Sequence, residues 1–136
     1  MRRVLAYGGF CLLDHFIWLL IQLLPGHALI GLARKRPWQR FQLSLPPLLK
    51  QQLEALICWL LRTRCRNAGW SSTCLSRSLS GRVLFDLIGV ANELHLGMSK
   101  LSDGRKVPHA WLMDPSNGRT FTPGLIPRAG VPLTVL

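Results

Sequence analysis

The chain has 136 residues and a formal net charge of +11, from 17 lysines and arginines against 6 aspartates and glutamates. Its length suits one domain around one hydrophobic core, so we expect residues 1–136 to form a single domain. The positive charge indicates an acidic or anionic partner. Nucleic acid is not expected, because the basic residues are scattered and accompany no zinc-finger or RNA-binding motif.

The four cysteines are Cys11, Cys58, Cys65 and Cys74. No two of them form a C-x-x-C pair, and structural zinc sites normally contain such closely spaced ligands. We therefore predict no metal site and name no cofactor. Free thiols persist in reducing compartments, so a cytoplasmic location is expected.

The first predicted element is a helix in the apolar run from Phe10 to Leu24. Asp14 and His15 interrupt this run, which argues against a signal peptide, and the run is shorter than the roughly 20 apolar residues of a transmembrane helix. We expect a buried helix with an inner face of Leu12, Leu13, Phe16, Ile17, Leu20, Leu23 and Leu24. The side chains of this helix are apolar on almost every face, so other parts of the domain or a partner must cover it. Peripheral contact with a membrane surface is the alternative.

A second helix is predicted from about Leu48 to Arg66, because the preceding Pro46-Pro47 can open a helix but not continue one. Its inner face comprises Leu49, Leu53, Leu56, Ile57, Leu60 and Leu61. Gly69 is a plausible left-handed stop after this helix. Residues 1–69 are therefore expected to form a helical N-terminal part.

Residues 70–79 are typical of a helix start with a cysteine in the first turn. Ser71, Ser72 and Thr73 supply cap residues, which accept hydrogen bonds from free N–H groups of the first turn. One face of the helix is apolar, with Leu75, Leu79, Val83 and Leu87 at four-residue steps. The positive end of a helix favours the nucleophilic thiolate of a cysteine such as Cys74. The alternative is an ordinary half-buried cysteine.

Alternating apolar residues predict strands over residues 91–98 and 107–113, with a short third strand over residues 119–122. Asp103-Gly104 and Asn117-Gly118 are hairpin-turn signals between them. An antiparallel sheet packed on the Cys74 helix makes the fold class α+β. The second strand carries His109, and a cysteine on a capped helix with a histidine on a later strand is typical of a thiol nucleophile with an imidazole base. His95, on the first strand, is the rival base.

Three blocks in this half resemble the lasso peptide biosynthesis B2 proteins. They are Thr73-Cys74-Leu75-Ser76-Arg77-Ser78-Leu79, the segment from Leu87 to Met98, and His109-Ala110-Trp111. The resemblance covers about residues 72–113. It implies a transglutaminase-like, papain-related core over residues 70–136, in which a cysteine-bearing helix packs on a small antiparallel sheet.

The resemblance implies that Cys74 is the nucleophile and His109 the general base and acid. Arg77 matches an arginine of the family and is assigned to substrate binding, as is Trp70; a solvated helix face is the alternative for Arg77. The family usually has an aspartate about a dozen residues after the histidine, where this chain has Thr122 instead. Asp114 is therefore the first candidate for the third catalytic residue, and Thr122 is its rival.

The activity that the resemblance implies is that of a bacterial cysteine peptidase in the maturation of ribosomally made peptides. It would remove the leader peptide from a lasso peptide precursor. The N-terminus is a leucine-rich helix rather than a small sheet-forming domain, so the expected partners are the precursor, a separate leader-recognition (B1-type) protein and the lasso cyclase. Two alternatives stay open: a non-catalytic adaptor that binds precursor or cyclase, and a transamidase that uses the same Cys/His pair.

Overall fold

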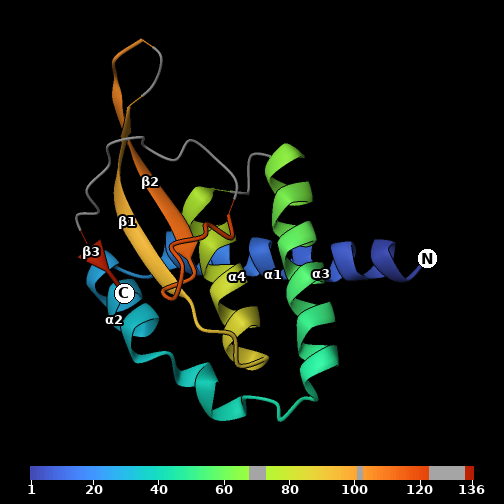
Figure 1. Cartoon of the computed structure of the whole chain (residues 1–136). Coiled ribbons are helices and arrows are strands. Elements are labelled where there is room, and N and C mark those ends of the chain that lie inside the picture. The colour runs from blue at the N-terminus through green and yellow to red at the C-terminus, as the bar shows by residue number, and fades with distance from the viewer. Residues whose placement is uncertain (68–72, 101–102, 123–133) are drawn as a thin grey trace.

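The computed structural model describes residues 1–67, 73–100, 103–122 and 134–136. The chain folds as an α+β protein with helices along one side of a small antiparallel sheet (Figure 1). In chain order the elements are α1 (Arg2–Leu23), α2 (Gly26–Lys35), the 3₁₀ helix η1 (Pro37–Phe41), α3 (Pro47–Arg66), α4 (Cys74–Leu87), β1 (Glu93–Lys100), β2 (Lys106–Met113) and β3 (Thr134–Val135). The predicted fold class is confirmed.

Helix α4 is the central element, and it contacts α1, α3, η1 and both long strands. It begins where the sequence predicted, because Thr73 and Ser76 form a reciprocal cap. The Ser76 N–H donates to Thr73 Oγ1 at 3.1 Å, and the Thr73 N–H donates to Ser76 Oγ at 3.0 Å. At Gly81 the helix comes so close to its neighbours that a Cβ would lie 2.9 Å from Leu112 Cδ1 and 3.1 Å from Leu61 Cδ1. A larger residue at this position would force the side chains of Leu112 and Leu61 to shift.

The rotation of α1 differs from the prediction. Phe10, Asp14 and Ile17 face inward, whereas Leu12 and Phe16, assigned to the inner face, are 73% and 58% exposed. The physical reason is that the carboxylate of Asp14 is buried and accepts a hydrogen bond from Arg64 Nε of α3 at 2.8 Å. A helix that is apolar on all sides has no preferred face, so the buried ion pair orients it.

Two further features of the N-terminal half were not predicted. Helix α1 starts at Arg2, well before the apolar run, and its length and mean hydropathy of 1.8 are sufficient for a membrane span. Helix α2 follows at once, with Pro25 as its N-cap residue. The Pro25-Gly26 pair therefore opens a new helix, which is consistent with the tolerance of helix starts for proline.

The sheet has the strand order β2-β1-β3. Strands β1 and β2 form the predicted hairpin, in register from Glu93 opposite Met113 to Lys100 opposite Lys106. The third strand was predicted wrongly. Residues 119–122 form only a bridge, Thr120 opposite Met113, and the other neighbour of β1 is β3. The ladder along β2 stops because the Leu112 N–H donates to the hydroxyl of Thr122 rather than to a main-chain carbonyl.

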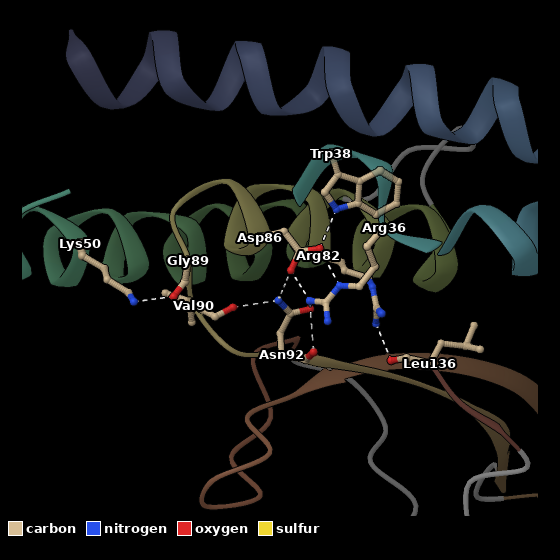
Figure 2. Close-up of polar contacts among 9 residues, drawn as sticks. All are labelled: Arg36, Trp38, Lys50, Arg82, Asp86, Gly89, Val90, Asn92 and Leu136. Atoms are coloured by element: carbon tan, nitrogen blue, oxygen red, sulfur yellow. Dashed lines mark hydrogen bonds and ion pairs between the residues drawn. The ribbon is translucent and has the colours of Figure 1, made fainter. Parts of the chain in front are cut away.

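A buried polar cluster holds the C-terminal end of α4 (Figure 2). The carboxylate of Asp86 accepts hydrogen bonds from Arg36, from Trp38 Nε1 at 2.6 Å and from Asn92 Nδ2 at 2.9 Å. Arg82 lies beside this cluster, is 1% exposed, and donates to the main-chain oxygen of Leu136 at 2.6 Å. Burial and then the charge of Arg36 lower the pKa of Arg82 to about 10, so Arg82 stays protonated at neutral pH.

Candidate active site

Cys74 is the first residue of α4 and is half-buried. The capping box at Thr73 and Ser76 fixes the backbone on both sides of it. The free N–H groups of a helix start carry a partial positive charge, which stabilises an anion at this position. This position is compatible with the predicted nucleophile, and Cys74 also packs against the hydrophobic core.

His109 lies in the middle of β2, opposite Gly97 of β1. Its ring stacks on Trp111, with the ring centroids 5.9 Å apart and the planes 20° apart. His95 stacks on the same Trp111 at 5.5 Å, so three rings form a row on one face of the sheet. The packing on Trp111 limits the orientations open to the imidazole of His109.

One hydrogen bond and one electrostatic interaction connect the first turns of α4 with β2, alongside which α4 runs (Figure 1). Ser78 Oγ, one turn after Cys74, donates to the main-chain oxygen of Ala110, the residue after His109, at 3.2 Å. Arg77 of the same turn acts on His109 through its charge. Arg77 and Ser78 are therefore neighbours of His109 and Ala110 in space, although more than thirty residues separate them in the sequence.

The described contacts contain no hydrogen bond between the Cys74 sulfur and the His109 ring. The rival His95 is engaged elsewhere, since its Nε2 lies 3.2 Å from Glu93 Oε2. The pairing of Cys74 with His109 remains a prediction. It requires the thiol at the start of α4 to reach an imidazole on the neighbouring strand.

Both candidates for the third residue make contacts of their own. Asp114 Oδ1 accepts hydrogen bonds from the Ser116 N–H at 2.9 Å and from Ser116 Oγ at 2.6 Å. These bonds lower the pKa of Asp114 and close the turn after β2. Thr122 is buried, and its Oγ1 accepts from the Leu112 N–H at 2.9 Å. Within the described contacts, the group that touches His109 is Trp111.

Trp111 and the Asp86 cluster are the residues that the sequence reasoning missed. Trp111 was named only as part of the His109-Ala110-Trp111 motif. The two-residue period of a strand already places it on the same face as His109. Nothing local in the sequence marks the Asp86 cluster, because its members lie up to 56 residues apart. The predicted substrate residue Trp70 lies outside the described residues, whereas Arg77 is half-buried next to β2.

A cavity of about 420 Å³ lies between α3 and residues 119–121. Its walls include Glu54, Cys58, Trp59, Arg62 and Arg119, and neither Cys74 nor His109 is among them. Burial raises the pKa of the Cys58 thiol, which makes that cysteine a weak nucleophile. In the part of the chain that the structure describes, no group of three or more His, Cys, Asp or Glu residues could hold a metal ion.

The charge of Arg77 should be visible in the pH dependence of any activity that uses His109 as base. Burial, and then the positive charge of Arg77, lower the pKa of His109 below its usual value near 6.5. Because its pKa is lower, the imidazole of His109 remains neutral at lower pH values than an ordinary histidine, and it can still accept a proton there. We expect Arg77→Gln to raise this pKa and to move the acid limb of the kcat/KM profile to higher pH.

The matched control for this shift is Lys35→Gln, which removes an exposed cation of α2. It should leave the acid limb where the wild-type protein has it. An acid limb that Arg77→Gln leaves in place, or moves to lower pH, would contradict the role of His109 as the titrating base.

A family model described as Transglut_core3, transglutaminase-like superfamily, matches residues 17–126. The matched range contains the whole of α4, β1 and β2, and with them Cys74 and His109. Comparison with curated proteins and with solved structures gave no significant match.

Proposed function

Because the chain belongs to the transglutaminase-like superfamily, whose members are typically cysteine-dependent hydrolases or transferases, we propose that it is a cysteine peptidase that removes the leader peptide from a lasso peptide precursor. The main support is the position of Cys74 at the capped start of α4, where the next turns of the helix contact β2 beside His109. The three sequence blocks that resemble the lasso peptide B2 proteins supply the substrate class.

The proposed reaction divides into acylation and hydrolysis. The imidazole of His109 takes the proton of the Cys74 thiol, and the thiolate attacks the carbonyl carbon between leader and core. The C–N bond breaks, the leader stays on sulfur as a thioester, and the imidazolium gives its proton to the leaving amine of the core. Water then attacks the thioester carbon while His109 accepts its proton, the C–S bond breaks to release the leader as a carboxylic acid, and the imidazolium returns the proton to the Cys74 thiolate. The N–H groups at the start of α4 are suited to stabilise the oxyanion.

The freed amine is the group that a separate cyclase would join to an acidic side chain. We propose that the peptidase works in the cytoplasm with that cyclase, with the precursor and with a separate B1-type leader-recognition protein. The net charge of +11 suits an acidic peptide or partner. Arg77, and Trp70 four residues before Cys74, are the proposed substrate-binding side chains.

A non-catalytic adaptor is the second candidate function. The observation that favours it is that the described hydrogen bonds of Asp114 and Thr122 are to Ser116 and Leu112, and none of them is to His109. An adaptor would keep the fold and bind precursor or cyclase without cleaving. A transamidase would pass the acyl group of the thioester to an amine instead of to water.

Intact-mass spectrometry of precursor incubated with the purified chain, with and without the recognition protein, distinguishes these functions. We expect leader and core fragments whose masses add up to the precursor plus one water, with faster release when the recognition protein is present. Fragments linked to an added amine would indicate the transamidase. An unchanged precursor, in the presence of the recognition protein and the cyclase, would overturn the peptidase.

A further inference from the structure

Helix α1 exposes a continuous apolar stripe on the side that faces away from the fold. The stripe consists of Leu5, Leu12, Phe16, Leu19 and Leu23, which are 69%, 73%, 58%, 40% and 78% exposed. Spacings of seven, four, three and four residues place these side chains on one face of the helix. We call this stripe the outer face of α1. The opposite side of α1 packs across α3 and α4 (Figure 1), so the described fold leaves the outer face uncovered.

The N-terminal part of the chain, which carries the outer face, is positively charged. Residues 1–53 contain seven lysines and arginines, and their only acidic residue is Asp14. Asp14 is 0% exposed and paired with Arg64, so this part of the chain presents no carboxylate to solvent. Arg2 and Arg3 at the start of α1, and Arg34 and Lys35 in the last turn of α2, are exposed. An apolar surface with this charge complements an anionic surface.

We propose that the outer face of α1 binds the surface of an anionic lipid bilayer, with the helix axis in the plane of the interface. An apolar face with cationic residues around it is the combination by which interfacial helices bind anionic lipids. A second copy of this chain would cover the leucines, but it would bring a second net charge of +11 toward the first and be repelled. A lipid surface supplies both the apolar phase and the negative charge.

The structure argues for binding along the membrane rather than across it, although α1 is long enough to span. The Asp14 carboxylate, in the middle of the helix, is paired with Arg64 of α3, and Phe10 and Ile17 pack in the core of the fold. A spanning helix would break that pair and carry Asp14 into the hydrocarbon, which is costly for a carboxylate. The inner side of α1 therefore stays with the protein, and only the outer face is available to lipid.

Flotation of the full chain with vesicles tests this binding. We expect the chain to float with vesicles of equal parts phosphatidylglycerol and phosphatidylcholine and not with phosphatidylcholine alone. Binding should weaken as salt is raised, because the Debye length falls from about 10 Å at 0.1 M to about 3 Å at 1 M. The double variant Leu12→Gln/Phe16→Gln removes two exposed apolar side chains and should lower the partition coefficient at least about tenfold.

The matched control is Phe41→Gln/Leu48→Gln, which changes two residues of similar exposure, 61% and 67%, outside α1. It should bind vesicles like the wild-type protein, and circular dichroism should show the same helix content for all three proteins. Absence of flotation at low salt would overturn the proposal, as would equal flotation with neutral vesicles or unchanged binding of the α1 variant. If the wild-type protein is a dimer that does not bind vesicles, and only the Leu12→Gln/Phe16→Gln variant is monomeric, the outer face binds a second copy. If the wild-type protein and the control variant bind the cyclase and only the Leu12→Gln/Phe16→Gln variant does not, the outer face binds a protein partner.

Discussion

Replacing Cys74 by alanine should abolish leader cleavage, with a loss of at least about a thousandfold in kcat/KM. The loss is large because no thioester can form without the sulfur, and both steps of the proposed reaction pass through it. The side chain is half-buried at the first position of α4, and the cap hydrogen bonds come from Thr73 and Ser76, so the variant should fold. The rate of leader release by mass spectrometry measures the effect.

The matched control is Cys58→Ala on α3. Cys58 is also half-buried, but burial raises the pKa of its thiol, and it lies on the wall of the α3 cavity away from Cys74. Its removal should leave the rate of cleavage close to the wild-type rate. If Cys74→Ala still supported maturation of the precursor with its partners present, the adaptor would replace the peptidase as the best account of this chain.

Replacing Asp86 by alanine should lower the free energy of unfolding by about 3–5 kcal/mol, the usual loss when one partner of a buried ion pair is removed. The carboxylate accepts hydrogen bonds from Arg36 and Trp38 at the start of η1 and from Asn92 just before β1, so it joins two distant segments of the chain (Figure 2). The negative charge of Asp86 also offsets the electrostatic repulsion between the cations Arg36 and Arg82. Without it, the half-buried Arg36 and the buried Arg82 would lose the carboxylate that lies between them in this cluster.

Urea denaturation followed by circular dichroism measures this loss of stability. The matched control is Asp103→Ala, because Asp103 also pairs with an arginine, Arg105 Nε at 2.7 Å, but both side chains are exposed. Exposed ion pairs contribute little, so the control should unfold at the wild-type midpoint. Equal midpoints for Asp86→Ala and wild type would show that the cluster does not hold the end of α4.

The features predicted correctly are those that short stretches of chain specify. The start of α4 follows from the hydroxyls around Cys74, because a cap bonds only to the next three residues. The β1–β2 hairpin follows from alternation, and the two turn signals are confirmed at Gly104 and Gly118, which have φ angles of 85° and 68°. Each of these features depends on residues close in the sequence.

The features predicted wrongly or missed depend on residues far apart. The face of α1 was misassigned because Asp14 finds its counterion in Arg64, fifty residues later. The third strand was misplaced because the segment after β2 makes only a bridge to Met113, whereas the third strand of the sheet comes from Thr134–Val135, which pairs with β1. Neither partner is marked by a local pattern, since the contact forms only when the helices and the sheet pack together.

The sequence by itself determined that this is an α+β member of the transglutaminase-like superfamily, with Cys74 at a capped helix start and His109 on a strand. Caps, alternation and turn residues act over a few positions, so they can be read along the chain. Only the tertiary structure decided which side of α1 faces solvent and which charges are buried at Asp14 and Asp86. A buried charge is stabilised by whichever oppositely charged side chain the fold places beside it. The separation of two residues in the sequence does not indicate whether they will form such a pair.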